Sequence, residues 1–211
     1  MEKNILQNRR YTRAFSQNIY PEKKLVENLI ERTFKLVPSK QNMMPYLITV
    51  FGPECIEEKE KIFKLSTREY HKKDGNPNVQ IKAPYLLVFS TRLIIKPNKY
   101  VKKLIKKGHK FKACDKDKFG ESSVIKEAAI EIGMFAMILT ELAIENEIDT
   151  AYTLCQLNDT KNQTIVKNQS LFMMSLGYQP TDFPTCKKER KVQKILLGET
   201  KPNMKDVVIW K

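Results

Sequence analysis

The chain has 211 residues, 41% hydrophobic and 29% charged, which is typical of a soluble globular domain and excludes an intrinsically disordered chain. Its 38 lysines and arginines against 24 acidic residues give a net charge of +14, which favours nucleic acid, acidic membrane surfaces or phosphorylated small molecules as partners. The longest mostly apolar run, residues 132–144, is too short to span a bilayer, and no apolar signal-peptide core opens the chain. We therefore expect one cytoplasmic domain over residues 1–211, with no membrane segment.

The first half of the chain predicts helices and strands in mixed order. Pro21 suits the first position of a helix, and apolar residues recur at helical spacing from there to about Leu36. The run "YLITVF" reads as a strand because it is rich in β-branched and aromatic residues. In chain order we expect a helix at 21–36, a loop at 37–46, a strand at 46–51, a polar helix at 53–66 and a buried strand at 83–93.

The second half predicts one long helix between shorter elements. Residues 96–118 are the most basic stretch and could form a short helix followed by a loop. The long helix is expected at 123–146, with Ser123 as its N-cap and apolar residues around most of its circumference. Strands are expected at 149–155, at 170–178 and, at the chain end, at 206–211. Because helices and strands do not alternate strictly, the predicted fold class is α+β.

No catalytic or metal-binding motif is visible in the sequence. The four cysteines form no CxxC pair, and only two histidines are present, so neither a zinc site nor a disulfide framework is predicted. With seven glycines, the chain has no P-loop and no GxGxxG motif. If the protein is an enzyme, we expect a bound cofactor to carry the chemistry.

Seven short motifs follow one another along nearly the whole chain: "RRYTRAF" (9–15), "PSKQNMMPY" (38–46), "APYLLVF" (83–89), "EIGMFAMILTELAIENEIDTAY" (131–152), "LGYQP" (176–180), "KER" (188–190) and "VVIW" (207–210). In this order they resemble the motifs of the FMN-dependent nitroreductase family. The resemblance implies a homodimer with a central, mostly antiparallel sheet flanked by helices. It also implies that helix 123–146 lies in the dimer interface and that the C-terminal extension reaches onto the partner subunit.

The same resemblance implies an FMN-dependent oxidoreductase in which NADH or NADPH reduces the flavin and a nitroaromatic, quinone or similar electrophile reoxidises it. No catalytic side chain and no metal are implied. The residues matching the family's phosphate contacts are Arg9, Arg10, Tyr11, Arg13, Lys188 and Arg190. Those matching its flavin-ring contacts are Pro38, Ser39, Asn42, Asn76 (or Asn78), Tyr152, Leu154 and Cys155. Arginine forks bind phosphate oxygens bidentately, which suits the first group.

The sequence also departs from the family pattern. Tyr11 replaces a usual serine, Met44 a glutamine and Tyr46 a tryptophan, and residues 152–155 are bulkier than the usual Pro- or Gly-containing segment. A flavin-binding protein with lost or altered activity therefore stays open. A second alternative is nucleic-acid binding through the lysines of 96–118, since backbone binding needs only clustered cations. Solvated surface charge and an ordinary turn are the plain alternatives for the basic motifs and for residues 38–46.

Overall fold

The computed structural model describes residues 9, 11–66, 78–92, 96–109, 121–154, 165, 170–180 and 204–209. Contacts divide the chain into two compact units, residues 1–179 and residues 180–211. The first unit holds a sheet and the helices around it, and the second holds the short helix α8 (Met204–Val207). The single domain over 1–211 stays a prediction.

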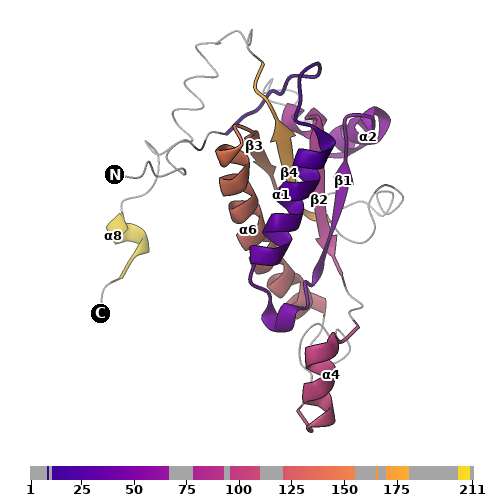
Figure 1. Cartoon of the computed structure of the whole chain (residues 1–211). Helices are drawn as coiled ribbons and strands as arrows, with labels where there is room; N and C mark the ends of the chain where they lie inside the picture. The colour runs from indigo at the N-terminus through magenta and orange to yellow at the C-terminus, as the bar shows by residue number, and fades with distance from the viewer. Residues whose placement is uncertain are drawn as a thin grey trace. The chain divides into compact units, whose positions relative to one another are not determined.

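An antiparallel sheet forms the centre of the first unit (Figure 1). Its strands, among the described residues, are β1 (Tyr46–Phe51), β2 (Tyr85–Thr91), β3 (Asp149–Thr153) and β4 (Ser170–Gly177). They lie in the order β1-β2-β4-β3, so β4 enters between two earlier strands. The register places Ile48 opposite Phe89 and Leu87 opposite Met174. The predicted α+β class with an antiparallel sheet is confirmed.

Helices cover both faces of this sheet. The covering helices are α1 (Lys23–Leu36), α2 (Ile56–Ser66) and α6 (Glu121–Glu145), together with the short 3-10 turn η3 (Val79–Lys82). The 3-10 turn η2 (Lys40–Asn42) follows α1, and α4 (Lys99–Lys106) lies beyond the end of the sheet (Figure 1). Figure 1 shows α1 and α6 side by side on one face. There the Phe135 ring of α6 meets Tyr46 and Phe89 edge-on, with ring centroids 6.1 and 5.6 Å away. On the other face, Ile62 of α2 and Ile81 of η3 cover a smaller cluster. Because both faces are covered, β2 is buried along its whole length, and its sequence from Tyr85 to Phe89 is an apolar run without alternation.

Two helix starts differ from prediction. The first residue of α1 is Lys23, with Glu22 in extended conformation at the N-cap, so Pro21 lies before the helix rather than at its first position. The long helix begins at Glu121, which puts Ser123 inside its first turn instead of at the N-cap. After its last residue, Glu145, the chain turns at Glu147 (φ 59°), and the Ile148 N–H donates to the Ala143 carbonyl at 2.8 Å. That left-handed residue satisfies a terminal carbonyl and turns the chain into β3.

The strand predicted at 206–211 is wrong for the residues described there. Residues 204–207 form a single helical turn, closed by a 2.8 Å bond from the Val208 N–H to the Met204 carbonyl. Valine and isoleucine favour strands only where a pleated surface packs against them, so their presence alone did not decide the conformation. Within the described residues, no helix has the length and apolarity needed to cross a membrane.

Candidate functional site

The N-terminal residues 9 and 11–16, called here the arginine segment, lie along the outer edge of β3. The Thr12 N–H donates to the Thr150 carbonyl at 3.2 Å, and the Ser16 N–H donates to the Tyr178 carbonyl at 2.8 Å. Phe15 is buried against the end of β4, where a Cβ at Gly177 would lie 2.9 Å from its ring. The segment is therefore seated on the sheet rather than a free basic arm.

Arg9, Tyr11 and Tyr152 come together at this edge. The Tyr11 hydroxyl donates to the Tyr152 carbonyl at 3.0 Å. Burial raises the pKa of the Tyr152 hydroxyl, while its hydrogen bond with Thr140 and the nearby charge of Arg9 act in the opposite direction. Leu154 is the first residue after β3 and is 75% exposed. An apolar surface therefore lies at the end of the strand that carries Tyr152. Arg13 is half-buried in the same segment.

A buried amide that the sequence did not single out joins these parts. Gln80 of η3 donates through Nε2 to the Tyr11 hydroxyl at 3.2 Å and to Thr153 Oγ1 at 3.0 Å. Asn78, the alternative to Asn76 in the sequence prediction, is 8% exposed and donates to the Ser66 carbonyl at 3.2 Å. A glutamine in a turn carries no pattern in a single sequence, so only the fold reveals this contact.

The second group of predicted residues lies in the connection between α1 and β1, residues 38–45, called here the strained loop. Gln41, Asn42 and Met44 have φ values of 56°, 54° and 48°. Non-glycine residues seldom occupy this left-handed region, and such strain persists only where the surroundings impose it. The Ser39 hydroxyl accepts from the Met44 N–H at 2.9 Å, which closes the loop on itself.

Neighbouring elements hold the strained loop in this shape. From α4, the Asn98 amide donates to the Gln41 carbonyl at 2.8 Å, and its oxygen caps the helix by accepting from the Val101 N–H at 2.9 Å. After β2, Arg92 donates to the Met44 carbonyl at 3.4 Å. Figure 1 shows α4 beside this end of the first unit. One asparagine therefore links the most basic helix to the loop.

From α6, two glutamates bind the start of the loop. Glu131 is 5% exposed, and its Oε1 accepts from the Lys40 N–H at 3.0 Å. Lys40 Nζ pairs with Glu127 at 2.6 Å. Burial raises the pKa of Glu131, which the hydrogen bonds from Lys40 and Ser39 partly counter. Its other oxygen is buried with no partner among the described residues.

The structure thus places the predicted site residues in two groups. Arg9, Tyr11, Arg13, Tyr152 and Leu154 belong to the β3 edge, where the hydrogen bonds run to β3, β4 and η3. Pro38, Ser39 and Asn42 belong to the strained loop, whose contacts run to α6, α4 and the end of β2. The others, Arg10, Asn76, Cys155, Lys188 and Arg190, lie outside the described residues.

The residue types at the β3 edge fit FMN. A phosphate monoester needs cationic donors, and an isoalloxazine ring needs apolar wall with a few polar groups. Arg9 supplies a guanidinium, and exposed Leu154 supplies apolar surface on the same strand end. In the strained loop, Gln41 Oε1 is buried without a partner in the described part of the chain. The assignment of each residue to FMN stays a prediction.

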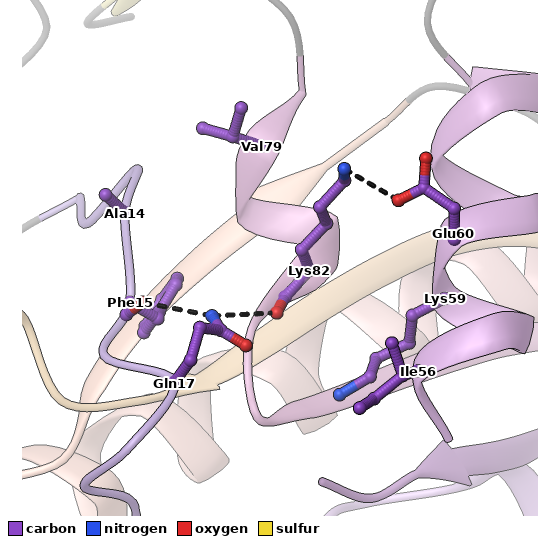
Figure 2. A pocket seen from close by; sticks show the side chains of 8 residues that line it. All are labelled: Ala14, Phe15, Gln17, Ile56, Lys59, Glu60, Val79 and Lys82. Atoms are coloured by element: carbon purple, nitrogen blue, oxygen red, sulfur yellow. Dashed lines mark hydrogen bonds and ion pairs between the residues drawn. The ribbon is translucent and has the colours of Figure 1, made fainter. Parts of the chain in front are cut away.

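A separate pocket of about 420 Å³ lies between Phe15, α2 and η3 (Figure 2). Its polar groups are used within the protein. Lys59 donates to the carbonyls of Ala83 and Pro84 at 2.9 and 3.0 Å, and Lys82 pairs with Glu60 at 2.6 Å. Figure 2 shows Gln17 reaching from the N-terminal chain to the Lys82 backbone. None of the predicted site residues that the structure describes lines this pocket, so the β3 edge is the better candidate site. The described residues also hold no His, Cys, Asp and Glu group suited to a metal ion.

No family model and no curated protein sequence matches the chain, but solved structures do. A nitroreductase family protein from Streptococcus pneumoniae TIGR4 has a TM-score of 0.65 at 18% identity, covering 98% of this chain and 98% of its own. A candidate NAD(P)H:FMN oxidoreductase from Staphylococcus epidermidis ATCC 12228 has 0.61 at 17%, covering 84% and 86%. CLA-ER, an enone reductase of gut-bacterial fatty acid saturation, has 0.60 at 15%, covering 85% and 89%.

At sequence identities this low, the structural similarity is evidence of a shared fold alone. The agreement extends over nearly the whole length of the chain and includes the antiparallel sheet with its long helix. The resemblance seen in the ordered motifs is therefore confirmed at the level of architecture: this chain has the nitroreductase fold.

Proposed function

We propose that the protein is an FMN-dependent oxidoreductase that uses NADH or NADPH to reduce nitroaromatic, quinone or similar electrophilic acceptors. The observation that carries the proposal is the arginine segment, held along β3 with Arg9 close enough to act on Tyr152. The fold supports it, since the similar structures include a nitroreductase family protein, a candidate NAD(P)H:FMN oxidoreductase and an enone reductase.

In this proposal the protein binds and orients, and FMN when bound supplies hydride transfer. Arg9 and Arg13 hold the phosphate, completed by Arg10, Lys188 and Arg190. Tyr152 and Leu154, at the end of β3, lie against the ring together with Cys155. The strained loop, with Ser39 and Asn42, supplies further polar contacts to the ring. This division of work agrees with the absence of any catalytic constellation in the sequence.

The first experiment is an absorption spectrum of the purified protein, with and without added FMN. The proposal predicts a yellow flavoprotein that NADH or NADPH bleaches without oxygen and that an added quinone restores. A protein that stays colourless with FMN would contradict it, and salt-sensitive DNA binding by such a protein would favour the lysines of α4 and its surroundings. A flavoprotein that neither NADH nor NADPH bleaches would support the alternative of a binder without reductase activity.

A pair of variants tests the phosphate assignment. Arg13→Ala should weaken FMN retention about tenfold or more, because a charged hydrogen bond to phosphate is lost. Lys102→Ala, on exposed α4, removes one positive charge elsewhere and serves as the control. Dissociation constants from quenching of flavin fluorescence give the comparison. Equal retention in both variants would count against the arginine segment as the phosphate site.

A further inference from the structure

Gln80 joins four segments of the first unit through one side chain and its own carbonyl. Its Nε2 carries two hydrogens, which three acceptors share: Thr153 Oγ1 at 3.0 Å, the Tyr11 hydroxyl at 3.2 Å and Asn78 Oδ1 at 3.4 Å. Its backbone carbonyl accepts from Ser175 Oγ of β4 at 2.6 Å. The arginine segment, η3, β3 and β4 therefore meet at this residue.

Because the hydrogen bonds of Gln80 are buried, breaking them would destabilise the fold. Gln80 is 2% exposed, and Thr153 and Ser175 are 4% and 1% exposed. A buried polar group left without its partner is destabilising, so the amide is held in the direction that its donors require. The Asn78 oxygen can only accept, which fixes which end of the Gln80 amide carries the donors.

The hydroxyl of Tyr11 is the point at which this cluster reaches the arginine segment. A phenol has a single proton to donate. Tyr11 gives that proton to the Tyr152 carbonyl at 3.0 Å, and its oxygen accepts from Gln80. The hydroxyl therefore works inside the protein, and the departure from serine at this position is a structural link rather than a phosphate donor.

Fixing Tyr11 restricts Arg9 and Arg13, the two arginines of its segment that the structure describes. Arg9 and Arg13 each lie two residues from it, and an extended chain spans at most about 3.3–3.6 Å per residue. A planar guanidinium binds phosphate well only when its fork faces the oxygens. The placement of Tyr11 consequently limits where both forks can be.

We propose that Gln80 is a positioning residue for phosphate binding: by holding the Tyr11 hydroxyl at the end of β3, it sets the positions of Arg9 and Arg13. This inference rests on the proposed function. It assigns to Gln80 a role that none of the motifs in the sequence indicated. It also replaces the predicted phosphate contact of Tyr11 by an indirect one through the backbone of its segment.

The test compares FMN with riboflavin, which has the same ring without the phosphate. Gln80→Met keeps the length of the side chain and removes its donors. We expect the Kd for FMN to rise about tenfold, roughly the value of one hydrogen bond to a charged or buried group, while the Kd for riboflavin is unchanged. A merely structural role would weaken both flavins alike, and that result would overturn the proposal, as would no change for either.

Gln17→Met is the matched control. Gln17 is also an amide that joins the N-terminal chain to η3, through the carbonyls of Phe15 and Lys82 at 3.1 and 3.2 Å, but neither bond involves Tyr11. We expect it to leave the preference for FMN over riboflavin unchanged. An equal loss of preference in this variant would overturn the specific role of Gln80.

Tyr11→Phe provides a second route to the same answer. It should reproduce the phosphate-dependent loss, and adding Gln80→Met to it should have no further effect on the FMN Kd, because both changes break one link. Additive effects would overturn the proposal. If Gln80→Met fails to fold, as thermal melting of the apoprotein would show, the single variant at Tyr11 still decides. A wild-type chain that binds neither flavin contradicts the proposed function itself, and the inference with it.

Discussion

At the scale of single residues, Glu131 makes stability depend on pH. One of its oxygens accepts from Lys40, and the other is buried without a partner among the described residues. Burial raises the pKa of this carboxyl, so the folded state binds its proton more tightly than the unfolded state. Stability from this group is therefore present at low pH and is lost as pH rises above the ordinary carboxyl pKa of about 4.3.

Glu131→Gln should raise the melting temperature at neutral pH, and the gain should shrink as pH falls toward 4.3. The amide keeps an acceptor for Lys40 and carries no charge to desolvate. In a chain of this size each kcal/mol is worth about 2–4 °C. Glu127→Gln, one turn away, is the control and should destabilise by at most about 1 kcal/mol, because it only breaks the ion pair with Lys40. Identical melting profiles for wild type and Glu131→Gln from pH 4 to 8 would contradict the prediction.

Some residues of the candidate site could be predicted from the sequence, and others could not. Arg9, Tyr11 and Tyr152 were selected through motif order, and the structure does place them side by side. Gln80 gave no signal, because a buried amide in a turn looks like any other polar residue until its partners are known. The strain at Gln41 was equally hidden, since positive φ is expected mainly at glycine and asparagine.

At the scale of elements, α6 carries an exposed face suited to a second copy of the chain. Ala129, Ile130, Gly133 and Met137 are exposed on it, with Ile130 57% and Met137 41% exposed. Among the residues that the structure describes, a Cβ at Gly133 would meet nothing within 4 Å. A glycine in mid-helix costs about 1 kcal/mol relative to alanine, which close approach of a partner helix would explain. The dimer-interface role predicted for this helix stays a proposal.

The charges at the two ends of this face indicate an antiparallel arrangement. Exposed Lys126 and Glu141 lie at equal distances from the point between Gly133 and Met134, and so do Ile130 and Met137. A two-fold axis at that point would place each lysine opposite the partner's glutamate and each isoleucine opposite a methionine. A two-fold interface requires such self-complementarity.

Charge reversal tests this register. Lys126→Glu alone and Glu141→Lys alone should each weaken dimerisation about tenfold by placing like charges together, and the double reversal should restore it. Gly133→Leu should weaken the dimer most, without lowering the stability of the monomer, because the chain alone has room for the side chain. Sedimentation over a range of concentrations measures both. A dimer unaffected by any of these changes would place the interface elsewhere.

Element boundaries followed from local chemistry where the local signal was strong. The strand at 46–51 was predicted at its observed limits, since Pro45 precedes it and Gly52 follows it. The long helix was placed within two residues of its start and one of its end. The strand predicted at 206–211 is wrong at residues 206 and 207, which belong to the helical turn Met204–Val207, because valine favours β structure only when a neighbouring strand is present.

At the scale of the whole molecule, strand order was beyond reach of the sequence. β4 is the last strand of the sheet along the chain and yet lies between β2 and β3. Such long-range pairing depends on which apolar surfaces cover one another after folding, and a single sequence does not encode it in local periodicity. The ordered motifs supplied the fold instead, and the structural neighbours agree with them.

The position of the arginine segment along the outer edge of β3 has a consequence for solubility. β3 is the last strand in the order, and an exposed strand edge is a template for pairing with other chains. Thr12 and Tyr11 occupy carbonyls of Thr150 and Tyr152 on that edge. The segment proposed to bind phosphate therefore also shields the sheet from self-association.

A chain that begins at Gln17 should accordingly aggregate on standing or mild heating, as light scattering would show. The double variant Arg9→Ala with Arg13→Ala should stay clear, because it loses the cations and keeps the backbone along the edge. Equal clarity of the truncated chain would mean that the edge needs no cover. If it aggregates, the arginine segment cannot be released to admit a ligand without exposing a surface on which the protein would precipitate.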